Sequence, residues 1–278
     1  MDRQPEVNCR LEIDTGGAKT LPVSFCARLA RKISRVTTFK DRLAGIEERI
    51  DAACKRAGRA RREVQLMTVS KGHPASAIVE AIEAGVALFG ENRVQEFERK
   101  RSEIDVLARR VLIEPQDFAF HLIGHLQSNK SARAVEIFSA IDTLDSLRLA
   151  ERLNDAAGKL GRRLPVLVEI KLSDEAAKTG VDPAGRELEE LLERARDLLH
   201  LNVRGLMTVP PFDDNPETAR NCFRRLRKLR DELARRHPKF DFAELSMGMS
   251  GDFEIAIEEG STLVRIGTAL FGVREAQA

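Results

Sequence analysis

The sequence contains no tryptophan and no tyrosine among its 278 residues, and it has only four cysteines: Cys9, Cys26, Cys54 and Cys222. The cysteines are far apart and form no CxxC pair, which argues against a disulfide framework or a zinc ribbon. We therefore expect reduced thiols in a cytoplasmic protein. No apolar run approaches the roughly 20 residues needed to cross a bilayer, so a transmembrane protein is excluded.

The sequence also lacks an excess of charge of one sign. Its 46 basic and 44 acidic residues give a net charge of +2, so we expect no polyanionic partner. A run of basic residues between Arg220 and Arg236 favours nucleic-acid binding when taken alone. Acids such as Glu217 and Asp231 are interspersed with it, which is more typical of a solvated helix face. We predict no nucleic-acid or membrane partner.

Residues 1–38 lack the periodicity of the remaining chain. Gly16, Gly17 and Pro22 interrupt this segment, and it has no continuous apolar stretch of the kind found in secretory signals. We predict a disordered N-terminal extension over 1–38, a structured region over 39–272 and a short tail over 273–278. A helical pattern begins at Phe39, and Gly58 is a plausible end for that helix.

From Glu63 onward, short β-rich runs alternate with amphipathic helical stretches. Strands are predicted at 64–70, 87–90, 118–123, 140–144, 165–170, 203–209, 244–247 and 263–267. Helices are predicted at 75–84, 94–109, 128–138, 147–160, 184–199, 217–236 and 253–259. Pro183 is expected in the first turn of its helix, and Asp252 or Ser250 is expected to cap the last one.

Eight strands that alternate with helices predict a parallel sheet, because parallel strands need crossover connections. Such units close most naturally into a (β/α)8 TIM barrel, an α/β fold with one domain. An open doubly wound sheet is the alternative. The turn after the first strand has no GxGxxG motif, which weakens a dinucleotide-binding interpretation.

Lys71 closes the first predicted strand, at the strand end where barrel enzymes place their chemistry. Apolar surroundings and a neighbouring cation would lower the pKa of this amine and make it nucleophilic. A solvated lysine at a strand end is the ordinary alternative. Glu91, at the end of the second strand, could orient Lys71 or cap the following helix.

The seventh and eighth predicted strands both end in glycine with hydroxyl residues. Gly248 stands between Ser246 and Ser250, and Gly267 precedes Thr268. Backbone N–H groups and hydroxyls of this kind bind anions, and phosphate often binds here in barrels. The alternative is that the glycines only serve tight turns. A phosphate site beside a nucleophilic amine suggests a Schiff base with a phosphorylated aldehyde.

Arg265 interrupts an apolar strand, and His121 and His125 lie four residues apart near the third strand. A buried guanidinium needs a hydrogen-bond partner, and the ring nitrogen of a cofactor could provide one. The two histidines could bind a metal only with a third ligand, and no acid or cysteine is spaced to supply it. We therefore predict no metal site and expect His125 to be a polar lining residue.

Taken together, these segments resemble the pyridoxal-phosphate homeostasis proteins, which are related to the N-terminal barrel of alanine racemase. The resemblance runs from about Phe39 to Gly272. It is carried by VSKGHPASAIVEAIEAGVALFGENRVQE (69–96), FHLIGHLQSNK (120–130), VEIKLSDEAAKTGVDP (168–183), VRGLMTV (203–209) and LSMGMSGDFEIAIEEGSTLVRIGTALFG (245–272).

This resemblance implies pyridoxal 5'-phosphate as cofactor, held as a Schiff base on Lys71. It also implies that Arg265 faces the pyridine nitrogen and that Asn92 and Met207 line the cofactor. The phosphate pocket of the family corresponds to Ser246, Ser250, Gly267 and Thr268. The family pattern has a second lysine where this chain has His73 and a tyrosine where it has Arg93, so the roles of those two positions are left open.

The residues favour a cofactor carrier over a racemase. Racemisation needs two bases on opposite faces of the substrate, and the racemases supply the second from a tyrosine of an added C-terminal domain. This chain has no tyrosine, and only six residues follow Gly272. Arg265 only donates hydrogen bonds, so it would keep the pyridine nitrogen unprotonated and weaken the cofactor as an electron sink.

We therefore predict a monomeric, non-catalytic protein of intracellular pyridoxal 5'-phosphate homeostasis, with apo forms of enzymes that use this cofactor as possible recipients. The alternative is a weak amino-acid racemase or a Schiff-base lyase. It would need a second base, for which His125 and Lys171 are the candidates.

Overall fold

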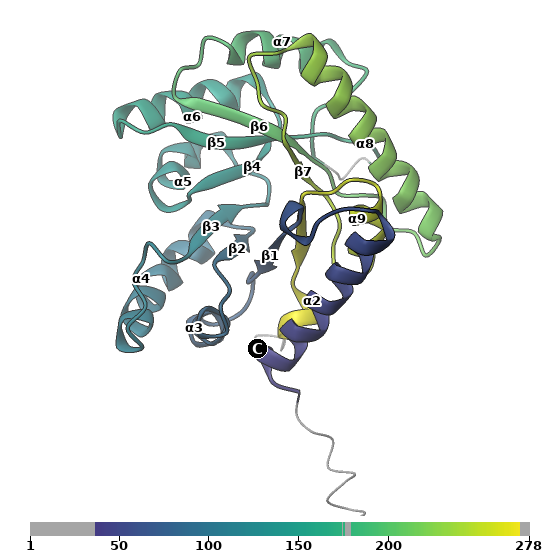
Figure 1. Cartoon of the computed structure of the whole chain (residues 1–278). Helices are drawn as coiled ribbons and strands as arrows, with labels where there is room; N and C mark the ends of the chain where they lie inside the picture. The colour runs from purple at the N-terminus through teal and green to yellow at the C-terminus, as the bar shows by residue number, and fades with distance from the viewer. Residues whose placement is uncertain (1–36, 174, 176–178, 273–278) are drawn as a thin grey trace, which may run out of the picture. The chain divides into compact units, whose positions relative to one another are not determined.

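Eight parallel strands form a closed barrel in the computed structural model, which describes residues 37–173, 175 and 179–272 (Figure 1). Each strand pairs with the next in the chain, and the last pairs with the first. The strands are β1 (Gln65–Val69), β2 (Leu88–Glu91), β3 (Ala119–Leu122), β4 (Ala140–Leu144), β5 (Leu164–Glu169), β6 (Leu201–Met207), β7 (Glu244–Ser246) and β8 (Leu263–Ile266). This closure confirms the predicted TIM barrel and rejects the open sheet.

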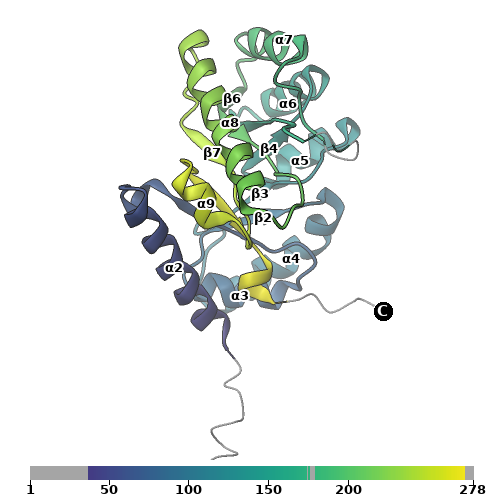
Figure 2. The same cartoon turned by 90° about the vertical axis from the view of Figure 1, so that its right-hand side faces the viewer.

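Helices connect the strands and cover the outside of the barrel (Figures 1 and 2). They are α2 (Phe39–Arg56), α3 (Ala75–Glu83), α4 (Val94–Arg110), α5 (Ser131–Ile137), α6 (Leu147–Lys159), α7 (Arg186–Ala195), α8 (Pro216–Arg236), α9 (Phe253–Glu258) and α10 (Thr268–Phe271). Each longer helix buries one apolar stripe, as α6 does with Leu149, Leu153 and Ala157 at steps of four. No described helix has the length and apolar content to cross a bilayer.

The first helix begins and ends where the sequence indicates. Thr38 is its N-cap, and its hydroxyl accepts a hydrogen bond from Asp41 N while the Asp41 carboxylate accepts one from Thr38 N. The helix ends at Arg56 with Ala57 as its C-cap, and Gly58 follows with φ of 65°, a conformation that glycine adopts without strain. Of the extension predicted over 1–38, residues 1–36 lie outside the described residues, as does the tail 273–278.

The structure differs from the sequence predictions at the starts of two helices and in one short helix that was not predicted. Pro183 does not lie in the first turn of α7, because that helix begins only at Arg186 after the N-cap Gly185. Pro216 instead occupies the first position of α8, where its missing N–H costs no hydrogen bond. The short helix α10 was not predicted, since four residues are too few to show a helical period.

Most of the core lies between the strands and the helices, while the barrel interior contains a second, smaller apolar cluster. Met67, Leu88 and Leu263 form this cluster, with Ala119 and Ile123 packed against it. Alternate strand residues point inward in a barrel, so a packed interior of this kind fills it rather than leaving a pore. Because all eight strands are parallel, the polar residues that follow their carboxyl ends gather at one mouth of the barrel.

Gly205 offers a test of the barrel packing, because it lies opposite Glu244 in the β6–β7 register. A Cβ atom on Gly205 would collide with the backbone carbonyl of Glu244, which belongs to the sheet and cannot move alone. We expect Gly205→Ala to lower the free energy of unfolding by about 1–3 kcal/mol. In the control Gly45→Ala, on exposed α2 with open space around the new methyl, stability should rise by about 0.5–1 kcal/mol. Urea unfolding of the two variants measures both values, and equal stabilities would contradict the packing described here.

Candidate functional site

Lys71 follows β1 and extends toward the residue that follows β2. Its Nζ atom lies 3.4 Å from Oδ1 of Asn92, and the lysine side chain is half-buried. Gly124, two residues after β3, lies so close to the Asn92 backbone that a Cβ there would be 2.9 Å from Asn92 Cα. The carboxyl ends of the first three strands thus bring the amine and the amide together at one mouth of the barrel.

The turn after β8 lies beside the strand that carries Lys71. The two strands pair with Thr68 opposite Ile266, one residue before Gly267. A Cβ on Gly267 would lie 3.1 Å from the carbonyl oxygen of Val69, two residues before the lysine. The amine and the Gly267–Thr268 turn therefore share one rim, which the sequence alone did not establish.

The turn after β7 is hydrogen-bonded to the turn after β8. The N–H of Ala269 donates to the Ser250 hydroxyl at 3.4 Å. Gly248 has φ of 96°, and a Cβ on it would lie 2.6 Å from Cβ of Ala256. Asp252 occupies the N-cap position of α9, as expected from the sequence, but its carboxylate makes no capping hydrogen bond to the helix. It instead accepts from Met249 N at 2.6 Å and fixes the turn. Burial raises the pKa of Asp252, and the hydrogen bond from Met249 opposes this shift.

Arg265 lies below these turns, inside the barrel, with only 4% of its surface exposed. Its Nη1 donates to both the carbonyl and the hydroxyl of Ser246 at 2.7 Å, and its Nη2 donates to the Thr208 carbonyl at 2.8 Å. The guanidinium therefore does not depend on a cofactor for its partners. Burial lowers the pKa of Arg265, but a guanidinium remains charged at neutral pH. Met207 is buried and pairs in register with Ser246, whose carbonyl and hydroxyl accept from Arg265.

The two histidines of the third strand region do not act together. His121 lies within β3, and its Nδ1 is 3.1 Å from the buried Asp142, while His125 lies beyond the strand with Nδ1 2.9 Å from Asp145. Asp142 of β4 and Asp145, which directly follows β4, each contact one of the two histidines, and the sequence analysis did not anticipate these two pairs. Among the described residues, no three His, Cys, Asp or Glu side chains are grouped so that they could hold a metal ion. His121 lines a cavity of about 290 Å³ at the opposite mouth, with Arg204 and Glu244. Burial alone would lower the pKa of His121, but Asp142 raises it above its usual value.

The sequence analysis did not predict the contacts of two buried acids near the barrel mouth, Glu169 and Glu91. Glu169 ends β5 and accepts a hydrogen bond from the Thr179 hydroxyl at 2.9 Å, and burial raises its pKa. Glu91 neither contacts Lys71 in a described hydrogen bond nor caps α4, whose N-cap is Arg93. Its Oε1 instead accepts from the Ser70 hydroxyl at 2.6 Å. One sequence signal could have identified both glutamates, because each is the single acidic residue at the end of an apolar strand.

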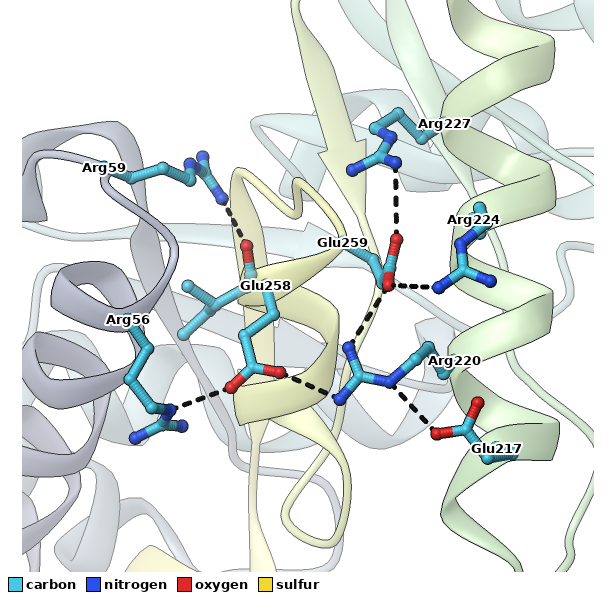
Figure 3. A network of polar contacts seen from close by, with 9 residues as sticks. Arg56, Arg59, Glu217, Arg220, Arg224, Arg227, Glu258 and Glu259 are labelled. Carbon is cyan, nitrogen blue, oxygen red and sulfur yellow. Dashed lines mark hydrogen bonds and ion pairs between the residues drawn. The ribbon is translucent and has the colours of Figure 1, made fainter.

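A network of ion pairs holds α9, the helix that follows the Gly248 turn, between α2 and α8 (Figure 3). Glu259, the C-cap residue directly after α9, is almost fully buried and pairs with Arg220, Arg224 and Arg227 of α8 at 3.0–3.4 Å. Glu258 joins Arg220 to Arg56 of α2, at 2.9 Å to each. Three arginines of the basic run on α8 are thus engaged in ion pairs and are not simply a solvated face.

These groups fit pyridoxal 5'-phosphate. The aldehyde of the cofactor can condense with the primary amine of Lys71. The phosphate oxygens accept hydrogen bonds, and the hydroxyls of Ser250 and Thr268 beside the Gly267 backbone are suitable donors. We call these hydroxyls and the turns that carry them the anion cradle. A side chain at Gly248 would collide with Ala256, and one at Gly267 would crowd the Val69 carbonyl, so either would disturb the turns. The buried, donor-only guanidinium of Arg265 matches a pyridine nitrogen as acceptor.

Comparisons with known proteins agree with this fit. A family model described as alanine racemase, N-terminal domain, matches residues 42–275. The pyridoxal phosphate homeostasis protein of Aquifex aeolicus is 43% identical over 235 residues, which cover 84% of this chain and 98% of the relative. The protein of that name from Escherichia coli K12 is 42% identical over 233 residues, covering 84% and 95%. The structure of PipY from Synechococcus elongatus with PLP bound superposes with a TM-score of 0.72 at 40% identity, covering 84% of this chain and all of PipY.

The α9 network predicts a pH-dependent contribution to stability. Burial alone would raise the pKa of Glu258, but hydrogen bonds from Arg220 and Arg56 hold it below its usual value. A carboxyl with a lowered pKa stabilises the fold above its unfolded pKa, and this contribution is lost as the pH falls through the folded value. We expect Glu258→Gln to cost up to about 1 kcal/mol at pH 7 and less near pH 3.5.

Urea unfolding at the two pH values measures this difference. The control Glu103→Gln, on the exposed face of α4, should cost much the same at both. A cost for Glu258→Gln that stays constant or grows as the pH falls would contradict the prediction.

Proposed function

The chain belongs to the pyridoxal phosphate homeostasis proteins within the alanine racemase N-terminal domain family, and we propose that it binds pyridoxal 5'-phosphate as a reversible Schiff base on Lys71. Its role would be to hold and release this cofactor for intracellular homeostasis. The observation that supports this most directly is the shared rim, because Lys71 and the Gly267 turn lie on neighbouring strands. The cofactor carries its aldehyde and its phosphate-bearing arm on adjacent carbons of one ring, and this rim offers a group for each.

Each residue of the site has a separate part in the proposal. Ser246, Ser250, Gly267 and Thr268 bind the phosphate, and the hydrogen bond between the two turns keeps them together. The Ser246 hydroxyl accepts from Arg265, and a hydroxyl that accepts one hydrogen bond can still donate another. Arg265 faces the ring nitrogen, while Asn92 and Met207 line the cofactor and Asn92 orients the Lys71 amine.

The cofactor supplies an aldehyde that condenses reversibly with an amine and releases water. Arg265 supports holding the cofactor over catalysis, because a group that only donates leaves a ring nitrogen unprotonated. The chain has no tyrosine to serve as a second base, and the ring of His125 is hydrogen-bonded to Asp145 at an exposed position. We propose a non-catalytic carrier that works in the cytoplasm as a monomer, with apo forms of enzymes that use this cofactor as recipients.

Reduction with borohydride tests covalent binding at Lys71. We expect peptide mass mapping of the protein incubated with pyridoxal 5'-phosphate and reduced to show a phosphopyridoxyl group on Lys71. Lys71→Ala should lose this group and the associated visible absorbance. The control Lys55→Ala, on the exposed face of α2, should keep both. Modification spread over several surface lysines at similar levels would contradict a dedicated site.

Exchange of the Cα hydrogen distinguishes the carrier from a weak racemase or lyase. When the loaded protein is incubated with L-alanine in deuterated water, we expect exchange no faster than with free cofactor, because the site lacks a tyrosine base. The exchange is measured by proton NMR over many protein equivalents of amino acid. Sustained exchange that Lys71→Ala abolishes would instead support the enzyme, and Lys171→Ala and His125→Ala would then locate its second base.

A further inference from the structure

A buried ion pair lies behind the segment that carries Lys71. Lys100, on α4, places its Nζ 2.7 Å from Oε1 of Glu91, the last residue of β2. The Glu91 side chain is fully buried and that of Lys100 is only 10% exposed. Lysine and glutamate rarely occupy such positions, because removing both charges from water costs more than most ion pairs return. The stability of the fold alone therefore does not account for this pair.

The same ammonium group is bonded to the backbone on both sides of Lys71. Lys100 Nζ donates to the carbonyl of Ser70 at 3.2 Å and to the carbonyl of His73 at 3.3 Å. These carbonyls belong to the residues that enter and leave the turn containing Lys71. One side chain from α4 thus holds both ends of the turn.

The two glutamates that contact Lys100 also bind this turn. Glu91 Oε1 accepts from the Ser70 hydroxyl at 2.6 Å, and Glu96 Oε1 accepts from Gly72 N at 2.6 Å. Glu96 lies 3.3 Å from Lys100 on the same helix. Glu91 is also followed directly by Asn92, whose side chain accepts from Lys71. Residues 70, 72 and 73 are therefore tied to one set of charges, while Lys71 projects into the barrel mouth.

We propose that Lys100, together with Glu91 and Glu96, is a positioning residue that fixes the turn at residues 70–73 so that the Lys71 amine is held ready for the aldehyde. Lys100 has no described hydrogen bond to Lys71, Asn92 or the turns after β7 and β8. It acts through the backbone of the Lys71 turn and through the two glutamates that bind this turn. Pre-organisation of this kind speeds bond formation, because the reacting atoms need not search for their alignment. The inference rests on the proposed function, since it assumes that Lys71 reacts with the cofactor.

The charges of the pair are interdependent. Burial raises the pKa of Glu91, and the charge and hydrogen bond of Lys100 oppose this shift. Without the ammonium, Glu91 would be a buried carboxyl with only the Ser70 hydroxyl as a described hydrogen-bond donor. Replacing Lys100 should consequently loosen the turn through the lost carbonyl contacts and also change the protonation of Glu91.

The variant Lys100→Met tests this inference, because methionine keeps much of the apolar stem and removes the ammonium. We expect the rate of covalent capture, followed by stopped-flow absorbance after mixing apo protein with pyridoxal 5'-phosphate, to fall by about tenfold or more. Affinity for pyridoxine 5'-phosphate, which has the phosphate and the ring but no aldehyde, should change less than about twofold, because the phosphate turns lie on β7 and β8. Lys55→Met on α2 is the matched control and should leave both values unchanged.

Parallel losses of capture rate and pyridoxine 5'-phosphate affinity would show a merely structural role and overturn the inference, as would an unchanged capture rate. If Lys100→Met does not fold, Glu96→Gln at a partly exposed position removes the carboxylate that holds Gly72. It should slow capture by about threefold with the same unchanged affinity. A wild-type protein that forms no adduct on Lys71 would refute the proposed function itself. A wild-type adduct together with variants that react at the wild-type rate would refute only the role of Lys100.

Discussion

The pairing of β8 with β1 is the interaction on which the site depends. It closes the barrel and places the end of the last strand beside the end of the first, so that Gly267 packs against Val69. Residues almost 200 positions apart in the chain thereby become neighbours, and an amine and an anion cradle occupy one rim. In an open sheet the first and last strands would lie at opposite edges, and the same residues could not bind one small molecule.

The buried charges of the protein are arranged mainly as supports. Arg265 is held by two carbonyls and a hydroxyl, Lys100 by two carbonyls and two carboxylates, and Glu259 by three arginines. Arg265 fixes the floor of the barrel mouth, and Lys100 fixes the turn that contains Lys71. Glu259 fixes α9, the helix that follows the turn after β7. A buried charge must satisfy its hydrogen bonds in one geometry, so such groups restrict a site to a single arrangement.

This arrangement suits the proposed role of a protein that holds a reactive aldehyde without using it. Binding both the aldehyde and the phosphate of the cofactor requires the amine and the cradle, which the strand ends provide. Racemisation would also require a second base, and an arginine that faces the ring nitrogen would leave that nitrogen unprotonated and weaken the cofactor as an electron sink. The family relationship and the local chemistry thus both support the proposed role, although they rest on different observations.

The sequence by itself determined the alternation of strands and helices, the strand ends at which Lys71, Ser246 and Gly267 stand, and the family. These features depend on local periodicity and short motifs, which a linear chain carries directly. Only the tertiary structure decided that Arg265 has protein partners, that aspartates of β4 and its following loop meet the two histidines, and that Lys100 lies behind the Lys71 turn. In the sequence Lys100 is one charge on a polar helix, and its burial depends on how α4 packs against β1 and β2, which no local pattern records.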